Sequence, residues 1–157
     1  MSEFTDYFNW LADGRWIRAS ARAIIFNQAQ DQILIERNHG VQNEYANFIG
    51  GGVEVGETLQ ECIQRELDEE SNAKITSARY LFVLENFIPY QSEVRHSLEH
   101  YFQIELEDEA LVPKNESVEF VWTPLDALAE IDLRPAIVRN VILDGSFQHV
   151  HHLVFSG

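Results

Sequence analysis

Three glutamates, Glu66, Glu69 and Glu70, stand three and four residues apart in the stretch GGGVEVGETLQECIQRELDEESNA, residues 50–73. Side chains at these spacings share one face of a helix, where like charges repel by about 0.2–0.5 kcal/mol per pair. A divalent cation removes this repulsion, and hard cations such as Mg²⁺ take oxygen ligands that they share with the phosphates of a substrate. The pattern therefore predicts a cation site on a helix that follows a glycine-rich turn.

The ends of this helix are marked in the sequence. Thr58 is followed three residues later by Glu61, which predicts a capping box and a helix start at Thr58. Asn72 follows the last turn, and asparagine is second to glycine as a left-handed helix stop. Cys62 falls on the side that the apolar spacing turns toward the core, so we interpret it as a small buried residue.

The same stretch carries a longer pattern. Gly51, Glu57 and the run Arg65–Glu70 match G-x5-E-x7-R-E-U-x-E-E-x-G-U, and on these residues the chain resembles the Nudix hydrolase family. The match runs from Gly51 to Ala73 and departs at its last two positions, where Asn72 replaces a glycine and Ala73 replaces a larger apolar residue. Neither departure removes a charged residue of the motif.

The resemblance implies a role for each motif residue. The three helix glutamates would bind the metal ions together with the carbonyl of Gly50, and Glu66 would also orient or deprotonate the attacking water. Arg65 would hold a catalytic glutamate in place, and Glu57 would support the loop or a metal-bound water. Because bound metals neutralise phosphate oxygens and activate a nucleophile near neutral pH, Mg²⁺ is the expected cofactor, with Mn²⁺ as an alternative.

The implied activity is metal-dependent hydrolysis of a phosphoanhydride bond in a nucleoside diphosphate linked to another moiety, whether a nucleotide, a nucleotide sugar or a dinucleotide. The alternative is a non-catalytic nucleotide-sensing Nudix-like module, although a pure binder has no need for the full set of acids. A diphosphate-ester isomerase is a third possibility, but the chain has no cysteine outside the motif helix to serve as its acid. In the family, a proline or a tyrosine downstream of the motif marks the substrate; here Pro89 and Tyr90 are adjacent, so this marker selects no single substrate.

Some acids and a cation outside the motif are further candidates. Glu116, with Glu119 and Glu99 as alternatives, would supply one more carboxylate to the metal site, and each is also interpretable as a surface acid. Arg37, at the end of a predicted strand, would meet a substrate phosphate or form a surface ion pair. Each of these roles is a prediction made from the sequence.

Four aromatic residues near the motif or after it have two interpretations. Aromatic faces stack on nucleobases, and aromatic side chains also contribute much of a protein core. We expect Phe48 and Tyr90 to contact the substrate, with Tyr45 and Tyr101 as further candidates and at least two of the four in the core.

Apolar alternation and turn residues predict a mixed sheet covered by helices on both sides, the α/β/α sandwich with a mixed β-sheet that the resemblance also implies. The segments 16–26 and 33–35 are expected to form a hairpin. Further strands are predicted at 75–88, 97–106 and 118–122, and another in the tail segment 147–155, FQHVHHLVF. Two later helices are expected, one starting at Thr123 and Pro124 and one capped by Asp132 that ends at Gly145.

Length and composition bound the remaining possibilities. The 157 residues are read as one domain, 1–157, with an N-terminal arm (1–14) and a C-terminal tail (146–157) packed on it. A net charge of −15 argues against a basic face for a nucleic-acid duplex, and no apolar run is long enough to span a membrane. One cysteine and no signal-peptide pattern favour the cytoplasm. A homodimer stays open, and the histidines at 149, 151 and 152 are interpreted as tail residues.

Overall fold

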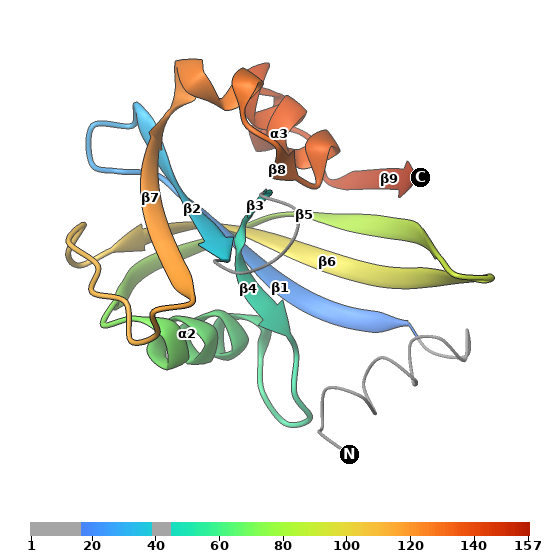
Figure 1. Cartoon of the computed structure of the whole chain (residues 1–157), viewed down its shortest axis with the longest axis horizontal. Helices are drawn as coiled ribbons and strands as arrows, with labels where there is room; N and C mark the ends of the chain where they lie inside the picture. The colour runs from blue at the N-terminus through green and yellow to red at the C-terminus, as the bar shows by residue number, and fades with distance from the viewer. Residues whose placement is uncertain (1–16, 39–44) are drawn as a thin grey trace.

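The computed structural model describes residues 17–38 and 45–157, which form two β-sheets (Figure 1). The larger sheet has five strands, in the order β4 (Ile49–Gly52), β1 (Arg18–Ile25), β6 (Glu93–Leu106), β5 (Ile75–Tyr90) and β9 (His152–Ser156). The smaller sheet has four strands, in the order β7 (Val118–Pro124), β2 (Gln32–Asn38), β3 (Ala46–Asn47) and β8 (Leu133–Arg134). The larger sheet is mixed, because β1 pairs antiparallel with β4 and parallel with β6.

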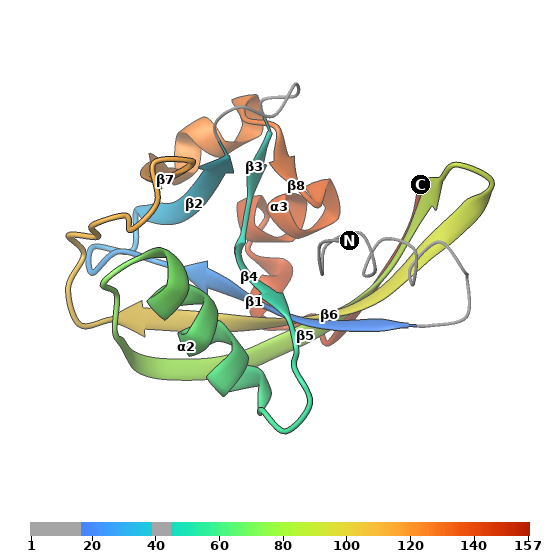
Figure 2. The ribbon, with the colours of Figure 1, turned by 60° about the horizontal axis from the view of Figure 1, so that its bottom comes forward.

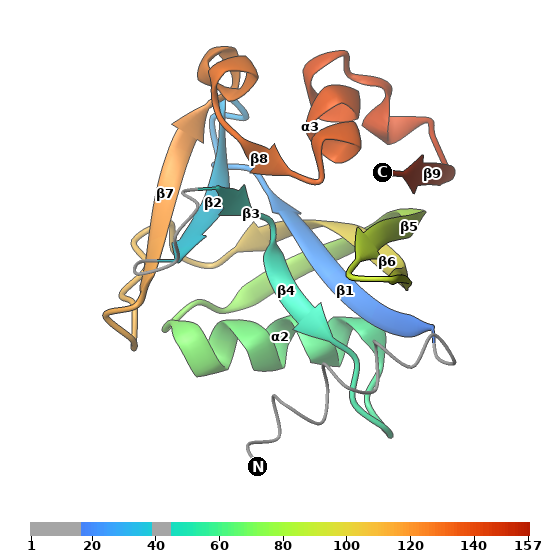
Figure 3. The same cartoon turned by 45° about the vertical axis from the view of Figure 1, so that its right-hand side comes forward.

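The larger sheet is covered on both faces (Figures 2 and 3). Helix α2 (Leu59–Glu70) packs on one face, and the smaller sheet lies over the other together with α3 (Ala136–Leu143). Two short 3-10 helices, η1 (Leu125–Glu130) and η2 (Ser146–Gln148), stand on either side of α3 along the chain. This is the predicted α/β/α sandwich. Neither α2 nor α3 is long and apolar enough to cross a membrane.

The sequence of β1 explains how one strand serves two cores. Ala21, Ala23 and Ile25 are buried against α2, whereas Ile24 joins the core on the opposite face. Successive side chains of a strand point to opposite faces, so this alternation places an apolar residue in each layer. The two alanines leave room for the helix, whose buried residues on this side include Cys62 and two larger apolar side chains.

The predicted capping box at the start of α2 is confirmed. Thr58 Oγ1 accepts a hydrogen bond from the Glu61 amide at 3.2 Å, and Glu61 Oε2 accepts one from the Thr58 amide at 2.7 Å. The predicted left-handed stop at Asn72 is wrong. The helix ends at Glu70, and its C-cap is Ser71, whose backbone is extended with φ −152°. Both the amide and the hydroxyl of Ser71 donate to the carbonyl of Leu67.

Asn72 has a different function in the structure. Its Oδ1 accepts a hydrogen bond at 2.7 Å from the amide of Val112, in the loop between β6 and β7. The amide of Lys114 in the same loop donates to the carbonyl of Glu70 at 2.8 Å. We call residues 112–114 the strap, because they fasten this loop to the last turn of α2.

The predicted hairpin is wrong as well. Strands β1 and β2 belong to different sheets, and the chain passes between them through a turn with an isolated bridge from Phe26 to Ile33. Gln30 adopts a left-handed conformation in this turn, with φ 59°. The strand predicted in the tail is present, because β9 pairs parallel with β5.

The two later helices begin elsewhere than predicted. Thr123 and Pro124 continue β7 in register with β2, and only the 3-10 helix η1 follows them. Asp132 does not cap α3, because its carboxylate pairs with Arg134 at 2.8 Å and the helix begins only at Ala136. The predicted end at Gly145 is confirmed by its left-handed φ of 77°.

Candidate active site

Arg65 is the central residue of the motif in the structure. Its Nε and Nη2 donate to the two carboxylate oxygens of Glu57 at 2.9 and 2.8 Å, a bidentate ion pair. Nη1 donates to Glu66 at 2.9 Å and to Glu69 at 3.3 Å, and Nη2 also donates to the Gly52 carbonyl at 2.9 Å. Arg65 therefore connects the turn before α2 with two of the predicted metal ligands.

Glu57 fixes the turn that leads into α2. Its Oε1 accepts the amide of Glu54 at 2.7 Å in addition to the bonds from Arg65. The hydrogen bond from Arg65, followed by that from the Glu54 backbone, lowers the pKa of Glu57 to about 2, and the same pair raises the pKa of Arg65. Both side chains are thus charged at neutral pH, and the loop-supporting role proposed for Glu57 agrees with this geometry.

Two glycines make room for the site. A Cβ on Gly51 would lie 2.1 Å from Glu66 Oε1, so this carboxylate packs directly against the glycine backbone. Gly50 has φ +142°, and a Cβ there would lie 2.0 Å from the carbonyl oxygen of Ala21. The carbonyl of Gly50, a predicted metal ligand, accepts a hydrogen bond from Arg22 Nη1 at 3.1 Å.

Glu70 contacts a residue that was not predicted from the sequence as a site residue. Its carboxyl hydrogen-bonds to that of Glu36 on β2, a residue that is only 8% exposed. Burial raises the pKa of both groups, and the negative charge of Glu36 contributes to a pKa of about 8 for Glu70. Burial and mutual repulsion thus both disfavour two negative charges on this pair.

A sequence signal for Glu36 exists, although it is weak. The residue ends the buried run of β2, where Leu34 lies two positions earlier in the core cluster that includes α2. An acid on the buried face of an apolar strand is unusual. The sequence alone does not say which helix covers that face, so the partner of Glu36 emerges only from the fold.

The site has the chemistry of a hard-cation site. The motif acids and Glu36 offer carboxylate oxygens, the donors that Mg²⁺ prefers. Within residues 17–38 and 45–157, no three histidine, cysteine, aspartate or glutamate side chains are close enough to form a ligand group as they stand. Glu66 and Glu69 are instead held by Arg65, and Glu70 is held by Glu36. The donor types fit the cation.

Two of the candidate acids beyond the motif lie at the surface. Glu116 is exposed in the loop before β7. Glu119 is exposed on β7, opposite Arg37 in the β2–β7 register, and Arg37 is exposed as well. The register agrees with the surface-ion-pair interpretation of Arg37.

Glu99 is buried in a separate polar cluster on β5 and β6. Its Oε1 accepts hydrogen bonds from Asn86 Nδ2 at 3.0 Å and from Ser97 Oγ at 3.2 Å. Its Oε2 accepts the hydroxyl of Tyr101 at 2.9 Å. Three neutral donors thus satisfy this carboxylate, which has a structural environment.

The predicted substrate contact of Phe48 is wrong. The ring is 1% exposed and packs edge-to-face on Tyr101 at 5.6 Å, because this stretch of chain enters the core before β4. Tyr101 in turn stacks on Phe82 at 5.0 Å, so both aromatics are core residues. Tyr45 packs under the guanidinium of Arg134 at 4.5 Å.

The remaining residues named from the sequence have packing or surface environments, apart from Tyr90, whose side chain is not described. Tyr90 ends β5 next to Pro89, and the position of its side chain is outside the described part of the structure. Cys62 is buried, and burial raises the pKa of its thiol to about 11, which agrees with a packing role. His152 lies 3.4 Å from Glu85 on the neighbouring strand.

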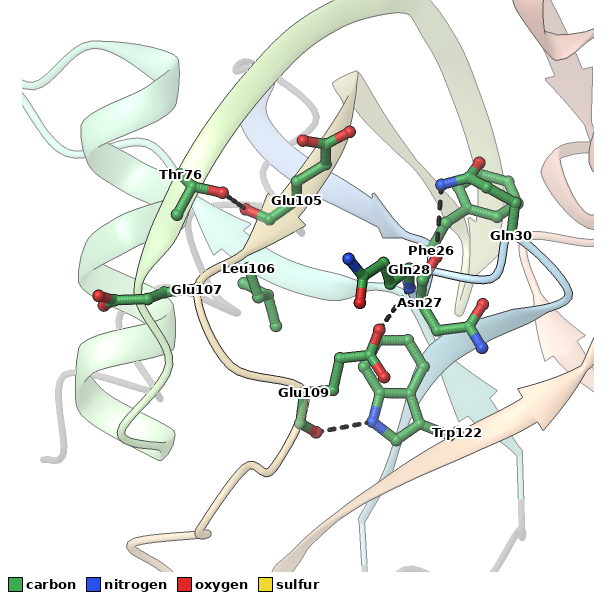
Figure 4. Close-up of a pocket in the computed structure, with 10 residues that line it drawn as sticks. All are labelled: Phe26, Asn27, Gln28, Gln30, Thr76, Glu105, Leu106, Glu107, Glu109 and Trp122. Carbon is green, nitrogen blue, oxygen red and sulfur yellow. Dashed lines mark hydrogen bonds between the residues drawn. The ribbon is translucent and has the colours of Figure 1, made fainter.

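The lining of a cavity of about 390 Å³ includes neither Glu36 nor the acids of the motif (Figure 4). It is bounded by the turn between β1 and β2, the ends of β5 and β6 and the indole of Trp122, whose Nε1 donates to the Glu109 carbonyl at 2.9 Å. The Glu109 carboxylate accepts the Gln28 amide. None of the residues that line this cavity was predicted as a site residue.

The arrangement of glycine turn, Arg65 and helix acids defines a class of protein. The family model for the NUDIX domain matches residues 16–143. The chain therefore belongs to the NUDIX domain family, and the assignment made from residues 51–73 is confirmed.

The comparisons with individual proteins agree. The chain is 27% identical over 126 residues to the NAD-capped RNA hydrolase NudC of Pseudomonas aeruginosa, which covers 80% of this chain and 43% of that protein. It is 30% identical over 122 residues to the NAD-capped RNA hydrolase NudC of Salmonella heidelberg, covering 77% of this chain and 45% of that protein. The chain thus spans less than half the length of these relatives.

Solved structures confirm the predicted fold class. The NUDIX domain of Shewanella oneidensis NrtR, solved in complex with ADP ribose, superposes with a TM-score of 0.67 at 16% identity, covering 93% of this chain and 98% of that one. An ADP-ribose pyrophosphatase from Streptococcus suis superposes with a TM-score of 0.63 at 19% identity, covering 90% and 100%. At these identities the likeness concerns the fold.

Proposed function

We propose that this protein is a Mg²⁺-dependent hydrolase that cleaves a phosphoanhydride bond in a nucleoside diphosphate linked to another moiety. The observation that carries the proposal is the Arg65 network, which holds Glu57, Glu66 and Glu69 beside the glycine turn. The NudC relatives support the substrate class, since they are hydrolases of NAD-capped RNA. The side-by-side Pro89 and Tyr90 leave the second moiety open.

The division of work among the residues follows from their positions. Glu66, Glu69 and Glu70 would hold Mg²⁺, which when bound neutralises phosphate oxygens and lowers the pKa of a bound water. Glu66 is partly buried, with 17% of its side chain exposed, and it is oriented by Arg65 and by the Gly51 backbone. We assign it the orientation and deprotonation of the attacking water. Arg65 is a positioning residue in this scheme.

A substrate panel tests the proposal. ADP-ribose, NAD⁺, a dinucleoside polyphosphate and nucleoside triphosphates are incubated with wild type and with Glu66→Gln, and the release of AMP or phosphate is followed with Mg²⁺ and with EDTA. We expect Mg²⁺-dependent release with wild type and a decrease of about 10²-fold or more in the variant. Asp68→Asn is the matched control, because Asp68 is on the same helix but pairs with Lys74 at 3.0 Å.

Two results would contradict the proposal. Undiminished hydrolysis by Glu66→Gln would remove the assigned role of this carboxylate. Binding of a nucleotide in calorimetry, without hydrolysis of any panel member by wild type, would support the nucleotide-sensing module instead.

A further inference from the structure

Glu36 and Glu70 bring two carboxyl groups together from different elements of the fold. Glu36 lies on β2, which belongs to the smaller sheet, whereas Glu70 lies on α2. We propose that Glu36 is a further carboxylate ligand of the cation, which is therefore held between β2 and α2. This inference rests on the proposed function, because it adds a ligand to the same site.

The contacts of Glu36 carry the inference. Its carboxyl meets that of Glu70, and Asn38 Nδ2 donates to its Oε1 at 3.2 Å. The Asn38 bond leaves further lone pairs of this carboxyl for another partner, because a carboxylate accepts about four hydrogen bonds or metal contacts. Glu66 and Arg22 are the other charged groups that act on it. Glu36 is thus oriented by a neighbour on its own strand and directed at a motif acid.

The burial of Glu36 gives the physical reason. Moving an ionised carboxylate out of water costs roughly several kcal/mol unless a partner of opposite charge compensates. Contact with a second carboxyl adds repulsion rather than compensation when both groups are ionised. A leucine at position 36 would be buried without the desolvation cost of a carboxylate and without repulsion from Glu70. A divalent cation between the two carboxylates compensates both, since hard cations bind several carboxylate oxygens at once.

The acids that the sequence favoured have other surroundings. Glu116 is exposed in a loop, and Glu119 is exposed opposite Arg37. Glu99 is as buried as Glu36, with 8% of each residue exposed, but three neutral donors satisfy it. Glu36 differs from all three because its carboxyl contacts a motif acid.

The test measures metal binding without substrate. Metal-free protein is titrated with Mn²⁺, and free Mn²⁺ is followed by electron paramagnetic resonance. We expect Glu36→Gln to weaken Mn²⁺ binding by about tenfold or more, because affinity depends on the number of charged ligands. Glu99→Gln is the matched control, since it removes a carboxylate of equal burial, and it should bind Mn²⁺ as wild type does.

A second measurement uses the wild type alone, in case Glu36→Gln does not fold. The protein is labelled with ¹³C-glutamate and titrated with Mg²⁺. The carboxyl signals of Glu36 and Glu70 should move together, whereas that of Glu99 should stay in place. A Glu36 signal that stays in place while Glu70 moves would overturn the inference.

The variants separate this inference from the proposed function. Glu70→Gln should weaken Mn²⁺ binding in either case. If Glu70→Gln weakens it while Glu36→Gln binds Mn²⁺ normally, the inference fails and the proposed function stands. The inference also fails if Glu116→Gln weakens binding and Glu36→Gln does not. If wild type binds no Mn²⁺, the proposed function fails and this inference with it.

Discussion

Glu36 and Glu99 are both strand glutamates of equal burial, but their hydrogen-bond partners differ. The carboxylate of Glu99 accepts three hydrogen bonds from neutral donors on its own and neighbouring strands. The carboxyl of Glu36 contacts that of Glu70 from another layer of the fold. A buried acid with a full set of donors contributes to a rigid fold, whereas a buried acid facing another acid is unfavourable until a proton or a cation arrives.

The surroundings of Glu99 and those of Glu36 are two different kinds of polar region in one molecule. The polar cluster around Glu99 lies between β5 and β6, and each oxygen of that carboxylate accepts a hydrogen bond there. Glu36 and Glu70 repel each other when both are ionised, and proteins tolerate such conflicts chiefly at functional sites. The difference is testable through stability, because the two carboxylates should respond to the same substitution with opposite signs.

Substituting each glutamate by glutamine should give the largest contrast. Glu99→Gln places an amide NH₂ against groups that already donate, so we expect a loss of about 1–3 kcal/mol in the free energy of unfolding. Glu36→Gln replaces one of two facing acids by a group that donates to Glu70, so the metal-free protein should become more stable. Urea unfolding in EDTA measures both. A loss of stability in Glu36→Gln equal to that in Glu99→Gln would abolish the contrast.

The pH dependence of the metal-free protein sharpens the comparison further. The pKa of Glu70 is about 8 in the folded state, raised first by burial and then by Glu36, against an ordinary 4.5. Between these two values the folded state binds a proton that the unfolded state has lost, so the free energy of unfolding decreases as pH rises through this range.

We expect that decrease to be roughly 1–2 kcal/mol, a figure reduced for solvent screening of the half-buried carboxyl. Urea unfolding in EDTA at a series of pH values measures it. Glu70→Gln should flatten the profile, and Mg²⁺ should restore stability at the alkaline end. Glu99→Gln should leave the slope as it is in wild type, because Glu99 is not part of the pair.

Gly51→Ala tests whether catalysis depends on the position of the Glu66 carboxylate against the backbone of Gly51. The added Cβ would lie 2.1 Å from Glu66 Oε1 and displace the carboxylate, while Arg65 retains its bidentate bonds to Glu57. We expect kcat to fall by about tenfold, which is about 1.4 kcal/mol in the barrier, with a smaller change in the free energy of unfolding. Steady-state kinetics and urea unfolding measure the two. Unchanged kcat would show that Glu66 acts from another position.

The features of the fold and of the candidate site that could be predicted from the sequence depend on residues close together in the chain. The capping box at Thr58 depends on two side chains three residues apart, and it is present as expected. The resemblance implied that Arg65 holds a glutamate in place, and Arg65 Nη1 lies 3.3 Å from Glu69 Oε1 one helical turn later. The family pattern added Glu57, which is eight residues before Arg65 and reaches it across the turn.

The parts that sequence missed depend on contacts between distant elements. Glu36 becomes a partner of Glu70 only because the smaller sheet lies close to the end of α2. Phe48 precedes the glycines and looked available for a base, but packing on Tyr101 of β6 buries it. Thr123 has the features of a helix cap, yet its pairing with Ile33 on β2 keeps it in a strand. In each case tertiary packing decided between two locally reasonable structures.

At Asn72 a local pattern and a contact between distant elements lead to different expectations. A substitution here should have the smallest effect of those considered. The family pattern has glycine here, so Asn72→Gly would be expected to stabilise the helix end if Asn72 were left-handed. In the structure its side chain instead binds the Val112 amide of the strap at 2.7 Å. We therefore expect Asn72→Gly to lower the free energy of unfolding by about 0.5–1.5 kcal/mol, through the lost hydrogen bond and the added backbone freedom. Hydrogen exchange of the Val112 amide should accelerate as well. Greater stability in Asn72→Gly, with unchanged exchange at Val112, would show that other contacts fasten the strap, among them the hydrogen bond from the Lys114 amide to the Glu70 carbonyl.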